Sequence, residues 1–168
     1  MPPLAILGSA RRGGHTAQLL GRLTAGQPCE VTDLLDARIG PFSYAQDYPP
    51  DDFLPVVRRM TAARLTIFAT PVYWYSYSAV MKNFIDRFSD LVLTQQDLGR
   101  QLRGRKFALM ASGADAMPER SLNIVFEQFC GYLGAKCVAC VYAREAGPFY
   151  DPAAAELVRV HLEKIETT

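Results

Sequence analysis

Short apolar runs alternate with amphipathic stretches along the whole of the 168-residue chain. The runs are brief and carry the β-branched and aromatic residues typical of strands buried on both faces. Five strands are predicted, at residues 3–7, 29–34, 65–69, 106–111 and 136–142. Four further segments show the three-and-four spacing of a buried helix face: Leu19, Leu20 and Leu23; Met81, Phe84, Ile85 and Phe88; Leu122, Val125, Phe126, Phe129 and Leu133; Val158, Leu162 and Ile165.

Strands that alternate with helices favour a mostly parallel sheet with helices on both faces, because right-handed crossovers are nearly obligatory between parallel strands. We expect a single α/β domain over residues 1–168, a flavodoxin-like three-layer sandwich with a five-stranded parallel sheet in the order 2-1-3-4-5. Its ligand crevice would lie beyond the carboxyl ends of strands one and three. Residues 39–53, rich in proline and aromatic residues, predict a long loop over the active end or against a partner.

Composition excludes several classes of protein. A hydrophobic fraction of 49% and a charged fraction of 21% are those of an ordinary globular protein, and a net charge of +1 predicts no nucleic-acid partner. The amino-terminal apolar run is too short for a signal peptide and carries no positive charge, and no later run approaches membrane-spanning length. We therefore expect a cytoplasmic protein without membrane insertion.

The cysteines and histidines do not predict a metal site. Cys137 and Cys140 have C-x-x-C spacing, but residues three apart on a strand point to opposite faces, so these two thiols are not expected to meet. We interpret the four cysteines as small buried hydrophobic residues. The two histidines, His15 and His161, are far apart in sequence and lack partners at metal-ligand spacing.

Residues 8–16, Gly-Ser-Ala-Arg-Arg-Gly-Gly-His-Thr, lie between the first predicted strand and the first predicted helix. A helix that begins near Thr16 would direct unpaired N–H groups and its positive dipole end into this loop, where Ser9 adds a hydroxyl and Arg11 a charge. These features favour a bound phosphate. The spacing fits neither a dinucleotide fingerprint nor a nucleoside triphosphate loop, since Ala10 and Gly14 replace the required glycine and lysine. The alternative is a flexible turn with solvated arginines.

Four aromatic residues lie within five positions just after the third predicted strand: Tyr73, Trp74, Tyr75 and Tyr77. Rings at a strand's end need a planar ligand or another subunit to cover them; the alternative is a small hydrophobic cluster under a loop. A phosphate loop and a clamp for a planar ring, on adjacent strands, match the two ends of one molecule, flavin mononucleotide (FMN).

The chain resembles the NADPH-dependent FMN reductase family over nearly its whole length. Residues 8–16 resemble the family's G-S-x-R-x-x-G-N-T loop, residues 70–74 its T-P-V-Y-W segment, and residues 81–87 its K-x-F-I-D-R helix. The resemblance implies contacts to the FMN phosphate from Ser9, Arg11, Gly14, His15 and Thr16, with His15 in place of the family's asparagine. It implies contacts to the ring and ribityl chain from Pro71, Val72, Tyr73 and Trp74.

A third loop, residues 112–115, follows the fourth predicted strand, where the family approaches the flavin from its far side. The resemblance implies cofactor contacts at Ser112 and Gly113, whose small size permits close approach. The alternative is an ordinary strand-to-helix turn. Related iron–sulfur flavoproteins carry a cysteine cluster in the segment corresponding to residues 39–53, which has no cysteine here, so no iron–sulfur centre is expected.

The resemblance implies an FMN-dependent oxidoreductase. NADH or NADPH would reduce the flavin, and a small acceptor such as a quinone, an azo compound or free flavin would reoxidise it. No catalytic side chain is named, because the chemistry takes place on the flavin. The resemblance also implies a homodimer or homotetramer. The alternatives are a flavodoxin-type electron carrier, against which the balanced charge weighs, and an FMN-binding sensor without turnover.

Overall fold

The computed structural model describes residues 1–116 and 120–163. Its parallel strands are β1 (Leu4–Leu7), β2 (Glu30–Asp33), β3 (Thr66–Tyr73), β5 (Lys106–Gly113) and β6 (Lys136–Arg144). They lie in the order β2-β1-β3-β5-β6, and a short strand, β4 (Ser76–Tyr77), pairs antiparallel with the end of β3. The predicted order 2-1-3-4-5 is confirmed, because β5 and β6 are the fourth and fifth parallel strands.

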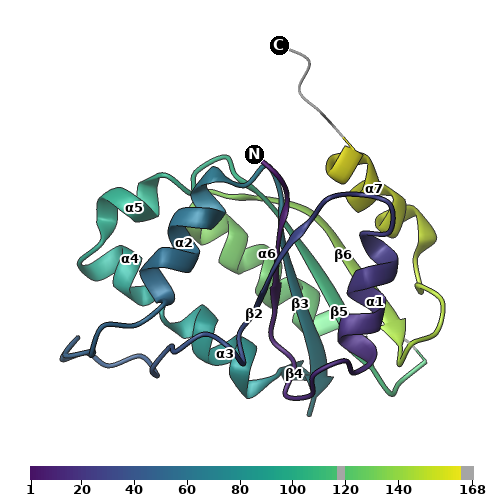
Figure 1. Ribbon diagram of the computed structural model, residues 1–168, viewed down its shortest axis with the longest axis horizontal. Helices are drawn as coiled ribbons and strands as arrows, with labels where there is room; N and C mark the ends of the chain where they lie inside the picture. Colours follow the sequence, from purple (N-terminus) through teal and green to yellow (C-terminus); the bar gives the residue numbers. More distant parts are fainter. Residues whose placement is uncertain (117–119, 164–168) are drawn as a thin grey trace.

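Helices cover both faces of the sheet, as predicted for a three-layer sandwich (Figure 1). One face packs against α1 (His15–Leu23) and α7 (Pro152–Glu163). The other packs against a larger group: α2 (Phe53–Ala62), α3 (Ala79–Asp86), α4 (Ser89–Leu93), α5 (Gln96–Arg100) and α6 (Arg120–Leu133). The helical pattern at Ile165 falls outside the described residues. Within the described ranges, no helix has the length and apolar character needed to cross a bilayer.

The two faces of the sheet bury different side chains. On the α6 side, the rings of Phe68, Phe84, Phe107, Phe126 and Phe129 pack with centroid separations of 5.3 to 6.4 Å. On the α1 side the core is smaller and largely aliphatic, including Ala5, Ile67, Ala108, Leu19 and Val158. Successive residues of a strand therefore pack into the cores on opposite faces of the sheet. This explains why each strand appears in the sequence as a continuous apolar run.

Several elements differ from the prediction: β4, α2, α4 and α5 were not expected, and β3, β5 and β6 run further than expected. β3 runs on past Ala69 to Tyr73, and at Pro71 it pairs with β5 where β1 no longer runs alongside, a position that tolerates a residue without an N–H. α2 begins at Phe53 and has Pro55 in its first turn, where the missing N–H is not needed. The predicted loop is confirmed up to Asp52.

The expectation that Cys137 and Cys140 would not share a face is wrong. β6 contains a bulge: Phe107 pairs with Cys137, but the next residue of β5 pairs with Ala139. The extra residue shifts the alternation of side chains along the strand. Both thiols therefore face the core on the α6 side, while Val138 and Ala139 face the α1 side.

Candidate functional site

A cavity of about 410 Å³ opens at the carboxyl ends of the parallel strands, beside the first turn of α1. It is lined by Ser9, Arg11, Gly14, His15, Thr16, Pro71, Val72, Tyr73, Ser112, Gly113, Ala114 and Glu145. These residues come from four segments that are far apart in the sequence and that meet at the lower edge of the sheet in Figure 1. Of the eleven residues that the family resemblance assigns to cofactor contacts, all but Trp74 line this cavity.

The first wall is the loop between β1 and α1. Gly13 has a left-handed backbone with φ of 64°, and Gly14 is the N-cap of α1, which receives no side-chain cap. The Ser9 hydroxyl accepts a hydrogen bond from the Arg11 N–H at 3.3 Å and donates one to the Arg11 carbonyl at 3.1 Å, so the loop holds its own shape. The uncapped N–H groups and the positive end of the helix dipole make this wall suited to an anion.

The two arginines of this loop have different surroundings. Arg12 points away from the cavity and forms a paired contact with Asp36 at 2.6 and 3.0 Å, which lowers the pKa of that carboxyl group. Arg11 lines the cavity and lies against Gly14, where an added Cβ would come within 3.3 Å of its Cδ. Arg11 is thus the arginine available to a bound anion.

The start of the loop is pressed against α3. A Cβ on Gly8 would lie 2.7 Å from the Met81 Cβ, so only glycine fits there. The Ser78 hydroxyl donates to the Gly8 carbonyl and accepts from the Met81 N–H at 3.0 Å, which caps α3. Thr70 of β3 accepts from the Ser78 N–H at 3.2 Å. The ends of β1 and β3 are thereby fixed relative to each other.

A buried pair of hydroxyl groups joins α1 to β5. The oxygens of Thr16 and Ser112 are 2.7 Å apart, and the two residues are 2% and 4% exposed. This contact links the loop at residues 8–16 to the loop at residues 112–115, although Thr16 and Ser112 are 96 residues apart in the sequence.

Thr16→Val removes one hydroxyl without changing side-chain shape, and we expect it to lower the free energy of unfolding by about 1–3 kcal/mol, because the Ser112 hydroxyl is left buried without its partner. Adding Ser112→Ala should recover part of this loss, since both polar groups are then gone. Urea denaturation of the two single variants and the double variant measures the coupling. A Thr16→Val protein as stable as the wild type would contradict this role.

The second wall carries the aromatic cluster, on the hairpin between β3 and β4. Trp74 and Tyr75 form its turn with left-handed φ values of 49° and 61°. Tyr73 lines the cavity, whereas the Trp74 side chain is 95% exposed and lies outside the cavity lining. Tyr77 belongs to the core, where its hydroxyl donates to the Leu122 carbonyl at 3.2 Å. Only one of the four rings therefore lines the cavity.

The third wall is the end of β5. A Cβ on Gly113 would lie 2.7 Å from the Tyr142 hydroxyl oxygen, so this close packing requires glycine. Burial, foremost, raises the pKa of Tyr142, whose hydroxyl donates to the Asp115 carbonyl at 2.8 Å. The Gly113 carbonyl accepts from the Glu145 N–H at 2.7 Å.

Sequence reasoning missed one wall of the cavity, at Glu145; the other lining residue that was not named individually, Ala114, lies within the third predicted loop, residues 112–115. Glu145 has a left-handed φ of 49° in the turn just after β6. It could have been found by the same rule that located the other walls, because β6 is also a parallel strand and its carboxyl end meets the same edge of the sheet.

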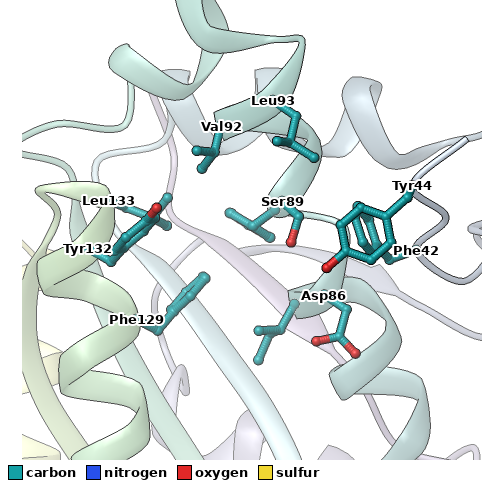
Figure 2. A pocket seen from close by; sticks show the side chains of 11 residues that line it. Phe42, Tyr44, Asp86, Ser89, Val92, Leu93, Phe129, Tyr132 and Leu133 are labelled. Carbon is teal, nitrogen blue, oxygen red and sulfur yellow. The ribbon is translucent and has the colours of Figure 1, made fainter. Parts of the chain in front are cut away.

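The loop at residues 39–52 lies away from the cavity at the strand ends. None of its residues lines the cavity at the strand ends; it is held against α3, where the Asn83 side chain donates to the Ile39 carbonyl at 2.8 Å. With α3, α4 and α6 it encloses a separate, largely apolar cavity of about 380 Å³ (Figure 2). Figure 2 shows Phe42 and Tyr44 on one side of it and Tyr132 on the other. Its lining has no cationic side chain, so it is not suited to a phosphate.

Comparisons with known proteins agree with this arrangement. The family model described as NADPH-dependent FMN reductase matches residues 1–147. YwqN of Bacillus subtilis (strain 168), named as an NAD(P)H-dependent FMN-containing oxidoreductase, is 30% identical over 139 residues, which cover 77% of each chain. The solved structure of the Trp repressor binding protein from Bacillus subtilis is 25% identical with a TM-score of 0.69, over 95% of this chain and 93% of the other.

A second solved structure, the apo form of NADH:FMN oxidoreductase (EMOB), shares the fold with a TM-score of 0.65 at 19% identity, over 95% of this chain and 86% of the other. The family match covers most of the chain and includes all four walls of the cavity. The chain therefore belongs to the NADPH-dependent FMN reductase family.

Proposed function

We propose that the cavity at the strand ends is the FMN site of this NAD(P)H-dependent oxidoreductase. The phosphate would lie on the first turn of α1, held by the N–H groups of residues 14–16, the Ser9 and Thr16 hydroxyls and the Arg11 guanidinium. The ring system would lie between Pro71–Tyr73 and Ser112–Gly113. The single observation that carries this assignment is that the uncapped α1 terminus and the end of β3 open into one cavity.

The residues present fit the cofactor. A phosphate monoester is matched by an uncapped helix start and by the guanidinium of Arg11, which makes no ion pair among the described residues. The cavity volume lies within the usual range for small-molecule sites, roughly 300–1,000 Å³. Gly113 lines the cavity while packing against Tyr142 more closely than a side chain would allow, so the third wall at this position is formed by backbone.

The protein's part in the reaction is binding and orientation. Bound FMN supplies the hydride chemistry between the nicotinamide and the acceptor. The α1 turn anchors one end, and the Thr16–Ser112 contact keeps that turn at a fixed distance from the wall that meets the ring. Tyr73, about half exposed, leaves one side of the cavity open to the nicotinamide and then to the acceptor. No side chain of the lining is required as an acid or base.

We further propose that the acceptor is a planar conjugated molecule, such as a quinone, an azo compound or free flavin. The Tyr73 ring, about half exposed in the cavity lining, supports this, because an aromatic face binds planar molecules by stacking. The exposed Trp74 and Tyr75 also support a homodimer or homotetramer in which another subunit covers this hairpin. Free cysteines at all four cysteine positions agree with a cytoplasmic location.

The purified protein is expected to be yellow, and anaerobic mixing with NADPH or NADH should bleach its flavin absorbance rapidly. Stopped-flow spectroscopy with each nucleotide gives the donor preference, and reoxidation by a quinone or an azo dye gives the acceptor class. Flavin that is reduced by dithionite but not by either nucleotide would instead support a carrier or a sensor. A protein that does not bind added FMN would contradict the assignment of the cavity.

A further inference from the structure

Among the described residues that line the cavity assigned to FMN, Glu145 alone carries a carboxylate. The other polar residues of the lining have hydroxyl, imidazole or guanidinium groups, all of which can donate a hydrogen bond. An ionised carboxylate only accepts hydrogen bonds. Within residues 1–116 and 120–163 the Glu145 carboxylate forms no hydrogen bond or ion pair, so it is available to a ligand with hydrogen-bond donors.

The backbone of Glu145 has a conformation that suits glycine better than glutamate. Its φ is 49°, in the left-handed region that destabilises residues with a side chain. Two hydrogen bonds fix this conformation: the Glu145 N–H donates to the Gly113 carbonyl at 2.7 Å, and the Gly147 N–H donates to the Arg144 carbonyl at 2.8 Å. Strain of this kind is concentrated at ligand sites, so a glutamate at this position indicates a role for its side chain.

The turn that carries Glu145 is joined to two walls of the cavity. Arg22 of α1 donates through Nη1 to the carbonyls of Ala146 and Gly147, at 2.6 and 2.9 Å. The turn is therefore tied to the helix whose first turn we assign to the phosphate. On its other side the Glu145 N–H is bonded to Gly113, in the wall that we assign to the ring. Glu145 is thus held between the segments assigned to the two ends of FMN.

The chemistry of FMN indicates which part of it meets the carboxylate. The donors of FMN are the hydroxyl groups of its ribityl chain and one ring N–H. The phosphate is an anion and repels a carboxylate. The ribityl chain joins the phosphate to the ring, so its hydroxyl groups are the donors that pass between the two walls.

We propose that the Glu145 carboxylate accepts hydrogen bonds from the ribityl hydroxyl groups and fixes the chain between the phosphate and the ring. This inference rests on the assignment of the cavity to FMN. The contact contributes more to the binding of riboflavin than to that of FMN, because the phosphate of FMN and the carboxylate repel each other. Loss of Glu145 is thereby distinguished from loss of a phosphate contact, which weakens FMN alone.

Glu145→Gly tests the proposal, because glycine removes the carboxylate and adopts the same φ without strain. The full-length apoprotein is titrated with three flavins and followed by flavin fluorescence. The Kd for riboflavin should rise roughly tenfold, as for the loss of a charged hydrogen bond. The Kd for FMN should rise less, since repulsion is lost too. Lumiflavin, which has neither ribityl chain nor phosphate, should bind equally well to the variant and the wild type.

Two further variants separate hydrogen bonding from charge. Glu145→Gln keeps an acceptor oxygen without the charge, so its Kd for riboflavin should lie between those of the wild type and Glu145→Gly. Asp115→Asn is the matched control: Asp115 follows the same wall but does not line the cavity, and its carbonyl, not its carboxylate, accepts from Tyr142 at 2.8 Å. This variant should change each Kd by less than about twofold, because exposed charges interact weakly.

Urea denaturation shows whether Glu145 acts on the ligand or on the fold. The midpoint of the Glu145→Gly apoprotein should equal or exceed that of the wild type, because strain is relieved. A lower midpoint, unchanged riboflavin affinity, weaker lumiflavin binding or a larger loss for FMN than for riboflavin would each overturn the proposal. A wild-type protein that binds none of the flavins would contradict the assignment of the cavity itself, so the two failures are distinguishable.

Discussion

Replacing Arg87 by methionine is expected to lower the free energy of unfolding by about 3–5 kcal/mol, because it leaves two carboxylates buried without their counter-ion. The Arg87 side chain is only 3% exposed; its Nε donates to Asp90 at 2.8 Å, and its Nη1 contacts Asp51. The guanidinium also lies over the Tyr48 ring, 3.7 Å from the ring centroid, and donates to the Gly40 carbonyl at 3.1 Å. The Arg87 side chain thus holds the loop at residues 39–52 against the junction between α3 and α4.

Lys82→Met is the matched control for that prediction. Lys82 lies on the same helix, α3, and pairs with Asp86 at 2.6 Å, but both side chains are about half exposed. An exposed pair four residues apart on a helix contributes about 0.3–0.5 kcal/mol, so the control should differ little from the wild type. Urea denaturation followed by circular dichroism, at equal FMN content, measures both. If Arg87→Met lowered the free energy of unfolding no more than Lys82→Met does, the buried ion pairs of Arg87 with Asp51 and Asp90 would not be what anchors the loop.

Arg11→Ala is expected to raise the Kd for FMN roughly 10- to 100-fold, which corresponds to the loss of a charged hydrogen bond of about 1.5–3 kcal/mol. Arg12→Ala should change the Kd by less than about threefold, because the exposed Arg12–Asp36 pair contributes little and points away from the cavity. The two neighbouring arginines therefore form a matched pair of variants. Fluorescence titration of the apoprotein with FMN measures both affinities.

Riboflavin, which lacks the phosphate, makes the test of Arg11 specific. The Arg11→Ala and wild-type proteins should bind riboflavin with similar affinity, since the lost contact is to the phosphate alone. A large loss of riboflavin affinity would instead show that the substitution had disturbed the cavity as a whole. Equal effects of Arg11→Ala and Arg12→Ala on FMN binding would contradict the assignment of Arg11.

Most of the fold could be predicted from the sequence. Short apolar runs such as residues 65–69 and 106–111 are typical of strands that are buried on both faces of a sheet. The cavity was readable for a related reason: parallel strands end at a common edge, so Ser9, Pro71 and Ser112 had to approach one another. The features that could not be predicted depend on local irregularities of the backbone. Nothing in the residue pattern of β6 specifies its bulge, and the face of Cys140 follows from that bulge alone.

The placement of Trp74 outside the cavity could not be predicted for a different reason. Four clustered rings were expected to act together, but a two-residue turn with left-handed φ values directs Trp74 into solvent and Tyr77 into the core. Side-chain direction in a tight hairpin depends on turn geometry rather than on residue type. The sequence showed that aromatic residues gather at the end of β3 without showing which of them would line the cavity.

The same hairpin gives the protein a built-in optical probe. Trp74 is the single tryptophan of the chain, so all indole emission originates at the tip of this hairpin, directly after a residue that lines the cavity. A yellow chromophore bound in the cavity would absorb that emission by energy transfer, and a neighbouring subunit over the tip would shift its wavelength. Filling of the cavity and covering of the hairpin can thus be told apart in unlabelled protein from a single fluorescence spectrum.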